Sequence, residues 1–432
     1  MEKYMKKALL TLFLAVIGSV ALLNAQNGTW SGKIQAGGTS LRVVFHLDDG
    51  ACTLDSPDQG VTGIEAAFER TLTGIKVVVP SLGASYEGIF NGKNIIGTFT
   101  QLGTSFPLTL SPGEENLNRP QTPKGPFPYS SEEVSFTNGD AVLKGTLTLP
   151  KDWTKDTPVL VMVTGSGLQN RDEEIYEHKP FAVIADHLAR NGIAALRYDD
   201  RGFGESTGDV VLCTTEDLKN DALSGVELMR QRFGKVGVIG HSEGGSIALM
   251  LASEGKADFI VTLAGMVISG EQTLILQNRL ALKKAGLSDE VTEAYCKALE
   301  SVFEDAKKGL DPVPPTNTDL PEALSRNIAA VCAQCSTPYM KYFLGMDLSS
   351  SIGAITCPVL ALNGTLDTQV DCSLNLSALR EGLRCPSDIV PVEGVNHLFQ
   401  HCRSGDSSEY RDIEETFSPE VLDKISSWVK GL

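Results

Sequence analysis

The feature that most restricts the fold is an alternation, from residue 131 to the end of the chain, of short apolar runs with longer amphipathic stretches. The apolar runs are PVLVMVTG, IAALRYDD, KVGVIGHS, DFIVTLAG, CPVLALNG and SDIVPVEG, and helical patterns such as FAVIADHLARNG and SPEVLDKISSWVKGL lie between or after them. Strands this apolar are buried on both faces, which requires a mostly parallel sheet with helices on both sides. The alternation therefore predicts an α/β fold.

One segment, from about residue 270 to 350, interrupts the alternation. Its pattern is helical, with a break at the proline-rich stretch LDPVPPTNTDLP. Because strand patterns resume directly after it, we expect this segment to be a helical cap inserted over the sheet.

Residues 27–111 have a different pattern, rich in Gly, Thr, Val and Ile and divided into short alternating runs by turn residues. This spacing predicts a small all-antiparallel sandwich or barrel. Its one histidine, His46, lies in a strand pattern and is interpreted as structural. Residues 112–130 contain five prolines and little that could pack, so we expect a linker there, followed by an α/β domain over 131–432.

The N-terminus has the pattern of a secretory signal. Three lysines precede an uninterrupted apolar run that starts at Ala8, and small residues surround Ala25. A retained anchor helix is the alternative, but NAQNG follows where a stop-transfer segment usually carries basic residues. We expect residues 1–25 to be cleaved and the protein to be periplasmic or extracellular, with no other stretch long enough to span a bilayer.

Charge and cysteine spacing exclude several classes of partner. The formal net charge is −17, or about −19 after cleavage, which disfavours nucleic acid and anionic membranes. The nine cysteines cannot all pair within one chain. Cys332 and Cys335 have CxxC spacing without a second CxxC or a nearby histidine, which favours a local disulfide or two buried thiols over zinc. Nothing in the sequence requires a metal or an organic cofactor.

The stretch GHSEGG places Ser242 between a predicted strand and a predicted helix, the context that the G-x-S-x-G motif requires. So sharp a turn forces the serine into an unfavourable backbone conformation, and Gly240 and Gly244 let neighbouring segments approach without Cβ clashes. The amide of Glu243 then points to where an oxyanion can form. An ordinary glycine-rich junction is the alternative, because five-residue patterns recur by chance.

A serine is a poor nucleophile without a base, and a histidine and an acid do follow later strand patterns. Asp367 comes after CPVLALNG and His397 after SDIVPVEG, which gives the order Ser, Asp, His. We predict that His397 takes the serine proton and that Asp367 holds the imidazole tautomer. Asp371 is a backup acid, His401 is interpreted as a surface or packing residue, and His241 as a packing residue that projects away from the reacting centre.

A second oxyanion donor is expected in the turn after PVLVMVTG, where the chain continues SGLQNRDE. Gly165 and Gly167 free the backbone for close approach, so the Ser166 amide is the preferred donor and the Gly167 amide the next. A plain glycine-rich turn is the alternative.

Two acid-rich stretches nearby are interpreted as structural. Asp199 and Arg201 in YDDRGFGES can bridge the loop after a strand, which we favour over a metal or phosphate site. Asp172, Glu173 and Glu174 are interpreted as a solvated acidic loop in preference to a site for a substrate's ammonium group.

Five stretches in this order, VTGSGLQNRDE, PFAVIADHLARNGIAALRYDDRGFGEST, GHSEGG, NGTLDTQV and NHLF, resemble the α/β-hydrolase superfamily. Within it, residues 130–432 are similar to secreted bacterial esterases related to serine aminopeptidase-type hydrolases. The turn reads TGSG where many members begin with His-Gly, and the N-terminal domain resembles accessory domains whose role the likeness leaves open. The resemblance implies a catalytic triad of Ser242, Asp367 and His397 and an oxyanion hole at Ser166 and Glu243.

These residues leave three functions open. The first, which we expect, is hydrolysis of a small-molecule carboxylic ester with a small or medium acyl group through an acyl-enzyme. The second is a peptidase or amidase with the same triad, and the third is a non-catalytic protein that binds an envelope component. Substrate preference separates the first two, and labelling of Ser242 by a fluorophosphonate separates both from the third.

Overall fold

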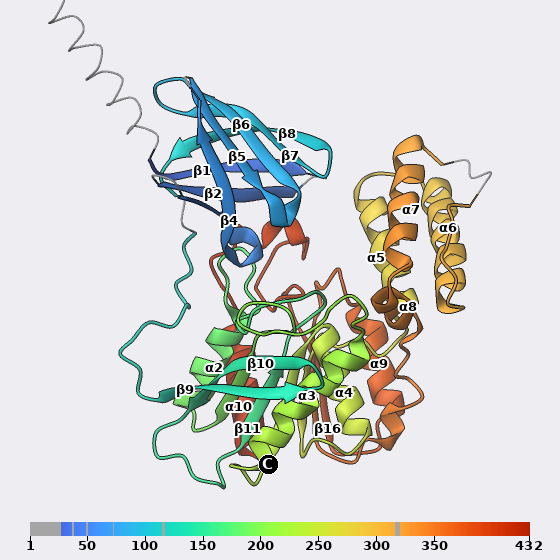
Figure 1. Ribbon diagram of the computed structural model, residues 1–432. Coiled ribbons are helices and arrows are strands. Elements are labelled where there is room, and N and C mark those ends of the chain that lie inside the picture. The colour runs from blue at the N-terminus through green and yellow to red at the C-terminus, as the bar shows by residue number, and fades with distance from the viewer. Residues whose placement is uncertain (1–26, 37–38, 49–50, 72, 115–116, 316–319) are drawn as a thin grey trace, which may run out of the picture. The chain divides into compact units, whose positions relative to one another are not determined.

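The computed structural model describes residues 27–432 apart from 37–38, 49–50, 72, 115–116 and 316–319 (Figure 1). The chain divides into two compact units. The first comprises the described residues up to Asn118 together with Ile175–Glu177, and the second comprises the described residues within Arg119–Glu174 and His178–Leu432. The secretory signal predicted over residues 1–25 lies outside the described residues. Within the described part, no helix is both long and apolar enough to cross a membrane.

The first unit is a closed barrel of eight strands, each antiparallel to the next. The ring closes where β1 pairs with β8 at Ser31 and Ser111. Of the two arrangements that the sequence leaves open, the structure is therefore the barrel and not the sandwich. The strands are β1 (Gly28–Ala36), β2 (Thr39–Asp48), β3 (Ala51–Ser56), β4 (Val61–Arg70), β5 (Gly74–Val79), β6 (Ala84–Phe90), β7 (Ile95–Gln101) and β8 (Thr104–Pro112).

The barrel encloses its own apolar core, which includes Trp30, Phe45, Tyr86 and Leu110. Side chains alternate between the two faces of a strand, so every second residue can enter this interior. Tyr86 is fully buried and its hydroxyl donates to the carbonyl of Ile95 at 3.0 Å, which satisfies the one polar atom that it carries inside. The barrel therefore has the core of an independent domain.

The second unit is built on an eight-stranded sheet in the order β16-β15-β14-β13-β11-β12-β10-β9. The strands β16, β15, β14, β13, β11 and β12 lie side by side in that order and are parallel to one another. Strand β10 is antiparallel to both of its neighbours, β12 and β9. The predicted mostly parallel sheet is confirmed, and β9 and β10 form an antiparallel hairpin at one edge of it. The strands are β9 (Ser130–Asn138), β10 (Ala141–Leu149), β11 (Val159–Val163), β12 (Ala194–Tyr198), β13 (Val236–His241), β14 (Ile260–Leu263), β15 (Val359–Gly364) and β16 (Ser387–Val392).

Amphipathic helices cover the sheet and share one hydrophobic core with it. In the last helix the buried apolar residues are Val421, Leu422, Ile425 and Val429, a spacing that puts them on one helical face. The helices that pack on the sheet are α2 (Pro180–Arg190), α3 (Thr215–Arg230), α4 (Glu243–Ser253), α9 (Cys372–Gly382) and α10 (Pro419–Lys430).

Four further helices lie between β14 and β15, within the segment for which a helical insertion is predicted (Figure 1). They are α5 (Gly270–Lys284), α6 (Asp289–Lys307), α7 (Glu322–Cys335) and α8 (Pro338–Gly345). This insertion has a core of its own, in which Cys332 and Cys335 are buried. All nine cysteines lie in the described part of the chain and are free thiols there, so the CxxC pair is two buried thiols.

Candidate active site

Ser242 stands at the turn between β13 and α4, in the conformation expected for a nucleophile elbow. Its φ of 54° and ψ of −118° lie outside the regions that an L-residue favours. The flanking glycines are sterically required, because a Cβ on Gly240 would lie 1.9 Å from the Gly244 carbonyl oxygen. A Cβ on Gly244 would lie 2.1 Å from the carbonyl oxygen of Val163 in β11. The structure thus excludes an ordinary, relaxed strand-helix junction.

Asp367 and His397 are brought together by the loops that follow β15 and β16. His397 Nδ1 and Asp367 Oδ2 are 2.7 Å apart, and both side chains are almost completely buried. The second oxygen of Asp367 accepts hydrogen bonds from the amides of Gln369 at 2.8 Å and Val370 at 2.9 Å. Because these bonds fix the carboxylate, it can orient the imidazole through Nδ1 and leave Nε2 available.

The other two polar candidates on these loops lie elsewhere. Asp371 is the N-cap of α9, where its side chain accepts from the Leu374 amide. His401 is exposed, and its ring nitrogens contact Glu415 and Glu420. Neither residue joins Asp367 and His397.

The turn after β11 approaches Ser242 closely. A Cβ on Gly165 would lie 3.2 Å from the Cβ of Ser242, so a larger residue would require the serine to move by a few tenths of an ångström. The Gly165 amide donates to Glu173 at 2.7 Å and is already occupied. Ser166 is the next residue and is exposed, with no hydrogen bond to its amide among the described residues. Glu243 opens α4, where helical amides have no intrahelical acceptor.

Glu173 is a functional candidate that sequence reasoning missed. The prediction of a solvated acidic loop is wrong for this residue, because its side chain is only 5 % exposed. One oxygen, Oε1, accepts from the Gly165 amide at 2.7 Å and lies 2.9 Å from His241 Nδ1. Glu173 therefore connects the turn beside Ser242 to the histidine that precedes Ser242.

His241 joins Glu173 to His397. Its Nε2 lies 2.9 Å from the His397 carbonyl oxygen, and the two histidine rings are 4.7 Å apart between centroids. Both ring nitrogens face acceptors, which favours the doubly protonated imidazolium. Burial by itself lowers the pKa of His241, but the Glu173 carboxylate raises that pKa overall above its usual 6.5. His241 is a buried packing residue, as predicted, but the prediction that it projects away from the reacting centre is wrong, because its ring lies against that of His397.

Asp200 is another buried carboxylate, and it contacts the turn that follows β11. It accepts from the Thr164 hydroxyl at 2.9 Å and from the Gln169 amide at 2.8 Å. Burial raises the pKa of Asp200 to about 8, and the nearby charges of Glu173 and Glu243 contribute to the rise. Asp200 is thus protonated at neutral pH, which avoids a third negative charge beneath the turn.

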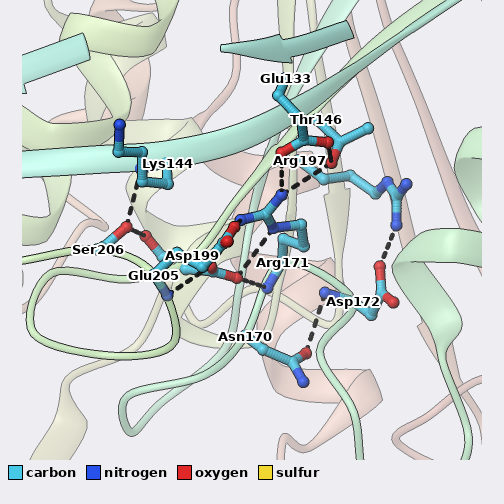
Figure 2. A network of polar contacts seen from close by, with 10 residues as sticks. All are labelled: Glu133, Lys144, Thr146, Asn170, Arg171, Asp172, Arg197, Asp199, Glu205 and Ser206. Carbon is cyan, nitrogen blue, oxygen red and sulfur yellow. Dashed lines mark hydrogen bonds and ion pairs between the residues drawn. The ribbon is translucent and has the colours of Figure 1, made fainter. Parts of the chain in front are cut away.

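Figure 2 shows how the loop after this turn is held in place. Arg171 binds the Asp199 carboxylate through its own amide at 2.7 Å and through Nη2 at 2.8 Å. The same guanidinium reaches Glu133 on β9 at 2.6 Å and the Thr146 hydroxyl on β10 at 2.9 Å. Although burial alone would raise the pKa of Asp199, the hydrogen bonds from Arg171 and neighbouring amides lower it overall.

The prediction that Asp199 and Arg201 bridge the loop after β12 is confirmed only for Asp199, whose carboxylate accepts from the Glu205 amide at 3.0 Å. Arg201 instead pairs with Asp221 of α3 at 2.6 Å, and both side chains are buried. Asp199 turns toward Arg171, so the loop after β12 holds the loop after β11. The acids are structural as predicted, but their partners come from distant parts of the chain.

The set of groups suits nucleophilic catalysis. A serine in a strained turn, an imidazole held by a carboxylate, and unpaired amides at the start of a helix are component types that acyl transfer uses. Among the described residues, no group of three or more His, Cys, Asp or Glu side chains is placed to hold a metal ion.

Residues 138–398 match the family model described as X-Pro dipeptidyl-peptidase (S15 family). This range covers more than half of the chain and includes Ser242, Asp367 and His397. The chain belongs to this family. The barrel lies outside the matched range, as does the last sheet-covering helix, α10. The narrower resemblance to serine aminopeptidase-type hydrolases stays a prediction.

Individual relatives of this S15-family chain have several names. It is 29 % identical over 315 residues to Esterase EstD of Thermotoga maritima, a match that covers 70 % of this chain and 68 % of the relative. An acyl transferase of Shewanella hanedai is 31 % identical over 122 residues, which is 28 % of this chain and 37 % of that protein. Est1E from Butyrivibrio proteoclasticus, solved with ferulic acid, is 16 % identical, with a TM-score of 0.43 over 69 % of this chain and 98 % of Est1E.

Proposed function

We propose that the protein is a serine hydrolase that cleaves carboxylic esters of small or medium acyl groups. The observation that carries this proposal is the hydrogen bond of 2.7 Å between His397 and Asp367 beside the strained elbow at Ser242. The named esterase among the relatives supports the choice of ester as substrate class.

The proposed reaction proceeds in two halves. Ser242 Oγ attacks the ester carbonyl while His397 Nε2 takes the hydroxyl proton, and Asp367 stabilises the resulting imidazolium. The amides of Ser166 and Glu243 stabilise the tetrahedral oxyanion. His397 then protonates the departing alcohol, and water attacks the acyl-enzyme by the same sequence of steps to release the acid and regenerate Ser242.

A peptidase that removes an N-terminal dipeptide is the second candidate, because the matched family model bears that description. Such an enzyme must recognise an α-ammonium group, which is largely protonated at neutral pH. The loop of Asp172, Glu173 and Glu174 is poorly suited to this, since each carboxylate already has a basic partner in Arg197, His241 or Lys179. We therefore favour the ester.

The test compares wild type with Ser242→Ala on p-nitrophenyl acetate and butyrate and on Xaa-Pro p-nitroanilides. We expect ester turnover by the wild type only, with a loss of about 10⁶-fold in kcat for the variant. Preferential cleavage of the anilides would select the peptidase. Equal turnover by both proteins would remove Ser242 from the site, and absence of fluorophosphonate labelling at Ser242 would support the non-catalytic alternative.

We also propose export to the periplasm or the extracellular space with cleavage after Ala25. Sequencing the N-terminus of the protein recovered from a bacterial host checks this, and an intact leader on membrane-bound protein would indicate the anchor instead.

A further inference from the structure

The loop between β15 and α9 carries Asp367, and its two ends are held in different ways. At its start, the Thr365 amide donates to the carbonyl of Val392 on β16 at 2.8 Å. At its end, Asp371 caps α9 by accepting from the Leu374 amide at 2.8 Å. The residues between these two points supply the amides that bind the Asp367 carboxylate. The orientation of this carboxylate therefore depends on what holds the middle of the loop.

One peptide unit in the middle of this loop contacts both Asp367 and the insertion. The N–H of Val370 donates to Asp367 Oδ1 at 2.9 Å. The carbonyl oxygen of the same peptide unit, which belongs to Gln369, accepts from Nε2 of Gln277 at 2.7 Å. Gln277 lies on α5, the first helix of the insertion. The insertion is thus two hydrogen bonds away from the carboxylate that contacts His397.

A donor at the carbonyl oxygen of a peptide unit controls the direction of its N–H. The unit is planar, so its C=O and N–H point in opposite directions within one plane. The hydrogen bond from Gln277 therefore directs the Val370 N–H toward Asp367. It also polarises the peptide, which strengthens the hydrogen bond that the N–H makes. A pocket of about 230 Å³ borders on these residues, but a water molecule there would have no fixed position and would not orient the peptide in this way.

We propose that Gln277 is a positioning residue for Asp367, so that the geometry of the triad depends on the contact between α5 and the loop after β15. The inference rests on the proposed function, because that function assigns Asp367 to the triad. The Gln277 amide orients the peptide, and the peptide N–H orients the carboxylate. The carboxylate in turn orients the imidazole of His397. The insertion and the triad are coupled in this way through main-chain atoms.

The test uses Gln277→Met with Asn278→Leu as its matched control. Both variants replace a partly buried amide of α5 with an apolar side chain of similar size, but Asn278 donates to the carbonyl of Leu274 on its own helix at 2.9 Å. For Gln277→Met we expect kcat on p-nitrophenyl butyrate to fall about tenfold with KM nearly unchanged, because the ester binds as before and only the imidazole is misplaced. For the control we expect both constants to stay within about twofold of wild type, because its lost hydrogen bond lies within α5.

Labelling by a fluorophosphonate supplies a readout that separates activation of Ser242 from folding. The final extent of labelling counts folded sites, whereas its rate depends on proton transfer to His397. We expect Gln277→Met to lower the rate about tenfold and to leave the extent unchanged. In an Asp367→Ala background, Gln277→Met should lower the rate no further, since no carboxylate is left to orient. The same loss in both backgrounds, or equal losses in Gln277→Met and Asn278→Leu, would overturn the inference.

Failure of the proposed function is recognisable separately. If the wild type neither hydrolyses esters nor is labelled by a fluorophosphonate at Ser242, the proposed function and this inference both fail. If the wild type is active and labelled but Gln277→Met matches it, only the inference fails. Should Gln277→Met unfold, Gln277→Glu provides the same test, because Glu has nearly the same size and helix propensity but, when ionised, no N–H to donate. Its labelling rate should fall by at least the same factor, and an unchanged rate would overturn the inference.

Discussion

At the scale of single residues, Glu173 holds the turn beside Ser242 and the histidine that precedes Ser242, because one of its oxygens contacts both Gly165 and His241. We predict that Glu173→Gln lowers the free energy of unfolding by about 3–5 kcal/mol, since it leaves a buried imidazolium without its counter-charge. The turn beside Ser242 also loses its anchor, so kcat should fall. Urea unfolding and ester kinetics measure the two effects.

Glu174→Gln is the control for this prediction. Its carboxylate lies on the same loop and pairs with Lys179 at 3.2 Å, but that lysine is 35 % exposed, so water screens the pair. We expect a change of about 1 kcal/mol or less. Similar losses in the two variants would show that the loop as a whole, and not the Glu173 bridge, sets the stability.

Among single residues, the sequence predicts the functional side chains that directly follow a strand, but it does not predict the contacts of side chains that lie further along a loop. Ser242, Asp367 and His397 each follow a recognisable strand, and parallel strands deliver their carboxyl ends to one edge of a sheet. Glu173 sits among charged neighbours that resemble a solvated loop, yet it has a positive φ of 53° and its side chain is buried. Arg171 lies 28 positions from Asp199, a pairing that no local pattern indicates.

At the scale of elements, the elbow between β13 and α4 depends on backbone contacts that leave no room for a side chain. A Cβ on Gly244 would collide with the carbonyl oxygens of Val163 and Thr164 at 2.1 and 2.5 Å, which are backbone atoms of β11 and the turn that follows it. We predict that Gly244→Ala costs about 2–5 kcal/mol of stability and lowers kcat/KM about 100-fold, because the elbow must shift. Chemical denaturation and ester kinetics check this.

Gly345→Ala is the matched control. Gly345 ends α8, and a Cβ there would meet no heavy atom within 4 Å. Alanine favours a helix over glycine by up to about 1 kcal/mol, so this variant should be unchanged or slightly more stable. A Gly244→Ala protein as stable as wild type would contradict the steric account of the elbow.

The strands and helices of the second unit follow the sequence pattern closely, whereas the barrel follows it less well. Strand β4 has a weak apolar pattern, because it carries Glu65, Glu69 and Arg70 and has no fully buried residue. Its inward positions, such as Ile64 and Phe68, are only partly buried against the core. The ring closes through the pairing of β1 with β8, two strands that are far apart in the sequence. The alternation of apolar and polar residues does not show whether this pairing forms, so it cannot distinguish a barrel from a sandwich.

At the scale of the whole molecule, three buried groups couple the folding of the second unit to pH. Burial lowers the pKa of His178 to about 4, with a further contribution from Arg119. Between pH 4 and about 6.5 the unfolded chain binds more protons at this histidine, so stability rises with pH. Asp200, with its pKa of about 8, binds more protons when folded, so stability falls as pH rises from about 4 to 8. The raised pKa of His241 acts in the same direction above 6.5.

The opposing contributions of His178 and Asp200 should nearly cancel below pH 6.5 and leave Asp200 unopposed above it. We therefore expect the wild type to be about equally stable at pH 5 and 6.5 and to lose at least about 2 kcal/mol by pH 8, because His241 adds to the loss from Asp200. Asp200→Asn removes only the pH dependence that Asp200 contributes to the free energy of unfolding. The stability of this variant relative to wild type should therefore rise by about 4 kcal/mol between pH 5 and 8. Urea unfolding at the three pH values measures this difference. A constant difference would mean that Asp200 is already ionised in the folded protein, with its charge balanced by the donors at Thr164 and Gln169.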